Sequence, residues 1–284
     1  MKIREYYANK IVELIKAEIE HPALNAEVLI SFYFGWDRTY FYLNQEQKLT
    51  VEECVAIDRL FARRIRREPL QYIVGKQNFY GRDFVTRPGI LIPRPETELL
   101  VESVIKQSES IWSDQPLAVV DLGTGTGVIA ITLALEKSNW SVAAVDISPL
   151  AIELAHENNR ELRADIELFQ GDLLQPLLTA SRKFDIIVSN PPYISRADIS
   201  GLSDEVRLHE PALALDGGET GLDYYCRIIN EGLPLLNRPG LIALEIGYGQ
   251  EKEILEMIKN SGATNQILIE DFQQIPRIIL AEYH

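Results

Sequence analysis

Residues 119–127 read Val-Val-Asp-Leu-Gly-Thr-Gly-Thr-Gly, a short apolar run that ends in three glycines at alternate positions. Residues 128–135 continue as Val-Ile-Ala-Ile-Thr-Leu-Ala-Leu. This order predicts a buried strand, a tight turn and an apolar helix. Glycines tolerate positive φ and carry no Cβ, so a ligand can lie against the backbone of such a turn. The stretch therefore predicts a doubly wound α/β domain with a ligand site at the turn.

The spacing of the glycines narrows the class of ligand. A dinucleotide-binding fingerprint has the form G-x-G-x-x-G, whereas here the third glycine comes one residue early, at Gly127, and Val128 follows it. The D-x-G-x-G-x-G form resembles the cofactor turn of class I S-adenosylmethionine (SAM) methyltransferases. The turn alone still leaves an NAD oxidoreductase possible.

Two acidic residues stand at the ends of the next two predicted strands. The strand at 140–145 ends in Asp146, roughly 20 positions beyond the glycines, where an acidic side chain can bind ribose hydroxyls. Asp172 follows the strand at 166–170 and can accept a hydrogen bond from an adenine amino group. Either aspartate alone could be a helix cap or turn residue, but the two in order favour a cofactor. The predicted cofactor residues are Asp121, Gly123, Thr124, Gly125, Thr126, Gly127, Asp146, Asp172, Leu173 and Asn190.

A second motif, Asn190-Pro191-Pro192-Tyr193, directly follows the apolar run at 184–189. The run predicts a buried strand that ends at a rigid turn, at the sheet edge where ligands bind. The Asn190 side-chain oxygen and the Pro191 carbonyl can each accept one N–H of a substrate NH2 group. Two such acceptors would free the nitrogen lone pair, and Tyr193 would offer a flat face to a planar substrate. We predict that Asn190, Pro191, Pro192 and Tyr193 bind the substrate and form the catalytic site.

Composition excludes several other classes of protein. The chain has 284 residues, 46% of them hydrophobic, and no run of 18 apolar residues that could span a membrane. Its N-terminus has no apolar signal sequence. Cys54 and Cys226 form no metal-binding spacing, and we expect both to be core thiols in a reducing cytoplasm. The four histidines are scattered, so we expect no metal.

Charge is distributed unevenly along the chain. Residues 1–90 carry 14 Lys and Arg against 12 Asp and Glu, whereas residues 91–284 carry 14 against 30. Binding of bare nucleic acid depends on basic contacts to phosphate, so the acidic second part argues against it.

Periodicity predicts the organisation of the chain. Residues 3–68 have apolar positions at helical spacing, and Thr50 with Glu53 forms a capping box that opens a helix to about Arg67. We expect a β-hairpin at 77–92, a βαβα pattern from about residue 118 to Ile246, a helix near 250–260, and two antiparallel strands near 265–270 and 276–283. The predicted domains are a helical domain (1–75), a β-hairpin linker (76–95) and a methyltransferase domain (96–284).

Seven segments that extend over nearly the whole chain form a family pattern. They are residues 70–75 (LQYIVG), 91–98 (LIPRPETE), 121–127, 145–146, 171–172, 189–194 (SNPPYI) and 210–218 (EPALALDGG). Together they resemble the HemK-type protein-(glutamine-N5) methyltransferases. The resemblance implies a helical N-terminal domain that docks a class I peptide-chain release factor, and a SAM-binding domain with a mostly parallel seven-stranded sheet. It also implies methyl transfer to the glutamine of a Gly-Gly-Gln motif.

Two alternative functions remain at this point. An adenine-N6 or cytosine-N4 DNA methyltransferase also methylates an exocyclic NH2 group, but it must hold a duplex on a basic surface. A SAM-binding scaffold without activity is disfavoured because the motif at 190–193 is intact.

Overall fold

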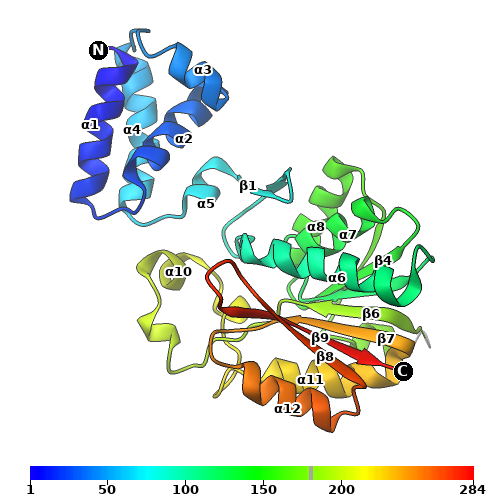
Figure 1. The fold of residues 1–284 in the computed structure, drawn as a ribbon. Coiled ribbons are helices and arrows are strands. Elements are labelled where there is room, and N and C mark those ends of the chain that lie inside the picture. Colours follow the sequence, from blue (N-terminus) through cyan, green and yellow to red (C-terminus); the bar gives the residue numbers. More distant parts are fainter. Residues whose placement is uncertain (179–181) are drawn as a thin grey trace. The chain divides into compact units, whose positions relative to one another are not determined.

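The computed structural model describes residues 1–178 and 182–284, which fall into two compact units (Figure 1). One unit combines Met1–Lys76 with the short segment Ser203–His209, and we call it the helical unit. The other combines Gln77–Leu202 with Glu210–His284, and we call it the sheet unit. The segment 203–209 therefore groups with the N-terminal residues, although it lies far along the chain within the predicted methyltransferase domain.

The helical unit encloses its own small core, in which Leu14, Leu29 and Phe41 are fully buried. The predicted capping box is present, because Thr50 Oγ1 accepts a hydrogen bond from the Glu53 backbone and the Glu53 carboxylate accepts one from Thr50 N. The helices are α1 (Ile3–Lys16), α2 (Pro22–Phe34), α3 (Arg38–Leu43), α4 (Val51–Ile65), α5 (Leu70–Val74) and α10 (Asp204–His209).

A buried arginine joins α10 to the rest of the helical unit. Arg64, on α4, is only 4% exposed and forms an ion pair of 2.6 Å with Glu205. Two further N–H groups of Arg64, on Nε and Nη1, donate to Asn25 Oδ1 and to the Glu68 carbonyl. The guanidinium is therefore held on several sides, as a buried charge requires.

The sheet unit contains seven strands in the order β5-β4-β3-β6-β7-β9-β8. The first five are parallel, and β9 pairs antiparallel with both β7 and β8. This is the expected class I methyltransferase fold, including the late antiparallel pair. The strands are β3 (Ala118–Leu122), β4 (Ser141–Asp146), β5 (Ile166–Gln170), β6 (Phe184–Ser189), β7 (Leu236–Glu245), β8 (Asn265–Glu270) and β9 (Pro276–Tyr283).

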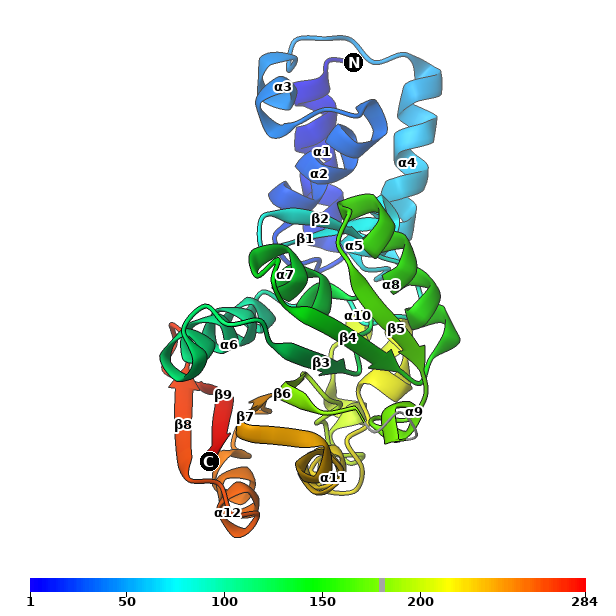
Figure 2. The same ribbon diagram turned by 90° about the vertical axis from the view of Figure 1, so that its right-hand side faces the viewer.

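Helices cover both faces of this sheet (Figures 1 and 2). Alternate strand residues point to opposite faces, so Val119 packs in one core with α6 and α7, and Val120 packs in another with α11 and α12. The helices are α6 (Glu96–Trp112), α7 (Val128–Glu136), α8 (Pro149–Leu162), α9 (Gln175–Leu178), α11 (Asp223–Gly232) and α12 (Glu251–Asn260), and the predicted hairpin consists of β1 (Lys76–Phe79) and β2 (Arg82–Val85).

The expectation for the cysteines was wrong for one of them. Cys226 is exposed on α11, because that helix buries the neighbouring face that carries Tyr225, Ile228 and Ile229. Cys54 is partly buried.

Candidate functional site

The register of the sheet places the ends of three strands side by side. Leu122 of β3 pairs with Val145 of β4 on one side and with Ser189 of β6 on the other. The residues that follow, including Gly123 and Asn190, therefore leave the sheet at the same edge. The order of the strands along the chain reverses between β3 and β6, and a parallel sheet opens a crevice for ligands at such a point.

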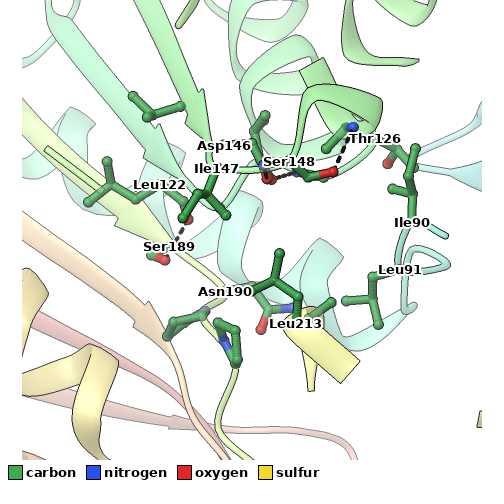
Figure 3. A pocket seen from close by; sticks show the side chains of 18 of the residues that line it. Ile90, Leu91, Leu122, Thr126, Asp146, Ile147, Ser148, Ser189, Asn190 and Leu213 are labelled. Carbon is green, nitrogen blue, oxygen red and sulfur yellow. Dashed lines mark hydrogen bonds between the residues drawn. The ribbon is translucent and has the colours of Figure 1, made fainter. Parts of the chain in front are cut away.

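A pocket lies at this edge, and the space between its lining residues, including the part that is open solvent, is about 1080 Å³. Figure 3 shows Asp146 and Ser148 on one side of it, Asn190 and Leu213 on the other, and Ile90 and Leu91 beside it. Many predicted site residues line the pocket, namely Gly123, Thr124, Gly125, Thr126, Asp146, Asp172, Leu173, Asn190, Pro191 and Pro192.

The glycine turn gives the pocket a floor of backbone. Gly123 and Gly125 have positive φ, and a Cβ placed on either would meet no atom within 4 Å. These two glycines therefore border open space that a ligand can fill. Gly127 has a packing role instead, because a Cβ there would lie 2.8 Å from Ile131 Cδ1.

Asp146 is fixed by the backbone on both sides of its carboxylate. One oxygen accepts a hydrogen bond of 2.8 Å from Gly125 N, and the other accepts one of 2.9 Å from Ser148 N. A carboxylate offers about four lone-pair positions, so roughly two remain for a ligand. Burial raises the pKa of Asp146, and the backbone hydrogen bonds oppose that rise.

Asp121 is completely buried beneath the turn and does not line the pocket. Its carboxylate accepts a hydrogen bond of 2.6 Å from Thr124 Oγ1, and burial raises its pKa to about 7. The structure thus gives Asp121 a role in shaping the turn, and its predicted contact with the cofactor stays a prediction.

Asp172 lines the pocket, and its carboxylate is already bound by the side chain of Arg227. Both Asp172 oxygens accept hydrogen bonds of 3.0 Å from the Arg227 guanidinium. Arg227 was not identified from the sequence, since its partner is 55 positions away.

Asn190 is held by residues that sequence reasoning did not identify. Its Nδ2 donates to Thr97 Oγ1 at 3.1 Å, and the Thr97 hydroxyl donates to Glu245 Oε2 at 2.7 Å. Thr97 lies in the first turn of α6, and Glu245 ends β7. One signal could have found Glu245, which is its position as an acidic residue at the carboxyl end of a buried apolar run.

Tyr193 does not line the pocket in this structure. Its ring packs against the core that contains α11 and α12, and its carbonyl accepts a hydrogen bond of 2.9 Å from Gln250 Nε2. Burial raises the pKa of Tyr193 to about 12. The stacking role expected for this ring therefore stays a prediction.

Two further segments meet beside the pocket. Arg94 of the segment 91–98 forms an ion pair of 2.7 Å with Glu210 of the segment 210–218. Residue Ile194, which follows the asparagine motif, exchanges backbone hydrogen bonds with Leu215 and Gly217. Three of the segments picked out by the sequence, 91–98, 189–194 and 210–218, therefore lie next to one another.

Other kinds of site are absent from the described residues. No group of three or more His, Cys, Asp or Glu side chains in residues 1–178 and 182–284 could hold a metal ion. No helix within the same ranges is long and apolar enough to cross a membrane.

Known proteins and family models match nearly the whole length of the chain. The family model "PrmC N-terminal domain" matches residues 9–75, and "Methyltransferase small domain" matches residues 95–207. A release factor glutamine methyltransferase of Geobacter sulfurreducens is 41% identical over 266 residues, which is 94% of this chain and 91% of that protein. The enzymes of the same name from Bacillus anthracis and Bacillus subtilis are 38% and 40% identical, and the matches cover 99% and 91% of both chains.

Solved structures are similar in fold at low sequence identity. The human Mettl16 catalytic domain in complex with the MAT2A 3′UTR hairpin 6 gives a TM-score of 0.56 at 16% identity and covers 83% of each chain. The 16S rRNA N2 G1207 methyltransferase of T. thermophilus, in complex with AdoMet and guanosine, gives 0.52 at 17% identity over 74% of this chain and 50% of that one. These likenesses show the methyltransferase fold.

Proposed function

The chain belongs to the family of release factor glutamine methyltransferases, and from this premise we propose how the residues of its pocket divide the work. It is an enzyme that methylates a release factor glutamine with SAM as the methyl donor. SAM supplies a methyl group that is already activated on a sulfonium, so the protein need not provide a strong nucleophile. The protein's task is to align the reacting groups and to exclude water.

The residues around the glycine turn fit this cofactor. Gly123 and Gly125 border open space, and Asp146 keeps acceptor positions that suit two ribose hydroxyls. Asp172 and Leu173 also line the pocket, and we assign them to the adenine. The proposed cofactor site thus combines the turn with the ends of β4 and β5.

Asn190 and Pro191 bind the substrate amide. The Asn190 oxygen and the Pro191 carbonyl accept the two N–H groups of the glutamine side chain and hold its nitrogen (N5) as positive charge develops there. Acceptors that gain strength as charge develops favour the transition state over the ground state. The extra proton leaves after methyl transfer, so no strong general base is needed. The Asn190 carboxamide, anchored at the pocket wall by Thr97, is the observation that carries this assignment.

The substrate is the glutamine of the Gly-Gly-Gln motif in a class I release factor, and residues 1–75 form the docking domain. The helical unit has a hydrophobic core of its own. This core holds its helices in place, so their outer faces can form a stable surface for a protein partner. The acidic composition of residues 91–284 disfavours direct binding of nucleic acid. Translation factors work in the cytoplasm, and we place the enzyme there.

The test uses full-length protein, tritiated SAM, and three acceptors offered separately: a release factor, the same factor with its Gly-Gly-Gln glutamine replaced by alanine, and duplex DNA. We expect label in the first acceptor alone. Faster labelling of DNA at physiological salt, or equal labelling of the alanine-substituted factor, would overturn the proposal.

A further inference from the structure

We propose that Thr97 and Glu245 are positioning residues that fix the orientation of the Asn190 carboxamide, so that its oxygen faces the substrate. The inference rests on the proposed function, in which Asn190 accepts a hydrogen bond from the glutamine NH2 group. It adds two residues, from α6 and β7, to the reaction carried out at the end of β6.

The orientation of a carboxamide matters because its two ends have almost the same shape and opposite polarity. With the oxygen toward the substrate, Asn190 accepts an N–H. With the NH2 toward the substrate, it would place a donor against a donor, and the substrate nitrogen would lose one of its two acceptors.

The hydrogen bonds select one of these orientations. A threonine hydroxyl has a single hydrogen, and Thr97 gives it to Glu245 Oε2 at 2.7 Å. Only lone pairs of Thr97 Oγ1 then remain for Asn190, whose nearest atom must be the donor Nδ2, at 3.1 Å. The amide oxygen is thereby left for other partners.

Burial makes this selection strong. Thr97 and Glu245 are each only 3% exposed, so water cannot easily replace either partner. The Tyr225 hydroxyl donates to the Glu245 backbone carbonyl, which holds the end of β7 in place. A donor facing a donor in such a place would cost more free energy than the same mismatch at the surface.

The direction of the chain of hydrogen bonds depends on the charge of Glu245. Burial raises its pKa to about 7, and this rise is opposed by hydrogen bonds from Thr97 and Asn190. Glu96 raises the pKa further and Arg277 lowers it, while the neighbouring Tyr193 and Tyr225 both titrate well above this range. A protonated Glu245 can donate to Thr97, which frees the threonine hydroxyl to donate to the amide oxygen and reverse Asn190.

The experiment compares Thr97→Val, Thr97→Ser and Glu245→Gln with the wild type. Thr132→Val serves as the matched control, because Thr132 is also fully buried and its hydroxyl has no hydrogen bond among the described residues. For each variant we would measure kcat and KM with release factor, the Kd for SAM, and the dependence of kcat on pH.

We expect Thr97→Val to lower kcat by about tenfold or more, the equivalent of one buried hydrogen bond, with little change in KM or in SAM affinity. Thr97→Ser keeps the hydroxyl and should restore most of the rate. Wild-type kcat should rise with pH through about 7, to which burial raises the pKa of Glu245. Glu245→Gln should abolish that rise, and Thr132→Val should match the wild type.

Two results would overturn the inference. One is a folded Thr97→Val protein with the kcat of the wild type. The other, which decides the question even if Thr97→Val does not fold, is a Glu245→Gln protein that keeps the pH dependence of the wild type. Failure of the proposed function would look different, because the wild-type protein itself would then leave the release factor glutamine unmethylated.

Discussion

Replacing Asp146 with alanine should weaken SAM binding and also loosen the glycine turn. The carboxylate is held by hydrogen bonds of 2.8 and 2.9 Å from Gly125 N and Ser148 N, so its free lone pairs point in fixed directions. A hydrogen bond to a charged group contributes about 1.5–3 kcal/mol. Loss of one such bond to the ribose corresponds to a roughly 10- to 150-fold increase in Kd.

The same change has a second, separable effect. Gly125 N and Ser148 N lose their acceptor, which costs about 1 kcal/mol for each hydrogen bond and should lower the free energy of unfolding by roughly 2 kcal/mol. Calorimetric titration with SAM measures the first effect, and urea unfolding without ligand measures the second. Asp165→Ala is the control, because this aspartate is exposed and lies directly before β5.

One outcome would refute the role of Asp146. If Asp146→Ala is folded by circular dichroism and binds SAM within about twofold of the wild type, the carboxylate contributes no charged hydrogen bond to the ligand. A loss of stability without a loss of affinity would restrict Asp146 to supporting the turn.

Three further predictions concern the reaction and its pH dependence. Asn190→Ala should remove most turnover and leave SAM affinity within about threefold, since its oxygen acts on the substrate; single-turnover labelling of release factor at saturating SAM measures this. Tyr193→Phe should leave the pH dependence of kcat unchanged, because a phenol with a pKa of about 12 stays neutral in any practical assay. The pKa of Glu245 is raised from 4.5 to about 7, so the native state holds this proton more tightly than the unfolded chain does. The free energy of unfolding should fall as pH rises through that interval, and Glu245→Gln should remove up to about 3 kcal/mol of the fall between urea titrations at about pH 5 and about pH 8.

The central part of the sheet could be predicted because its parallel strands are buried on both faces. Such strands appear as short apolar runs, and the run at 184–189 coincides with β6. The strand β5 lies at the edge of the sheet, and only Ile166 in it is buried. The carboxyl ends of β3 and β6 share one edge, which is why the sequence alone predicts that Gly123 and Asn190 lie together.

The partners of Asn190 could not be predicted in the same way. Glu245 reaches it through the register of β6 on β7, where Ser189 lies opposite Leu244, and a single sequence does not reveal that register. Thr97 belongs to the segment 91–98, but its hydrogen bond with Asn190 spans 93 positions of the chain. The burial of individual apolar residues could not be predicted either. Ile15 and Leu24 occur at helical spacing with other apolar residues, and both are nevertheless more than half exposed.

The membership of α10 in the helical unit has a consequence for how the enzyme can be divided. The chain passes between the two units three times, after residues 76, 202 and 209, so no single cut releases either one intact. A fragment ending at residue 76 would keep Arg64, which is only 4% exposed in the whole protein, and would lose its partner Glu205. An exchange of the N-terminal residues between related enzymes would therefore have to include the segment 203–209 as well, so that Arg64 keeps its partner Glu205.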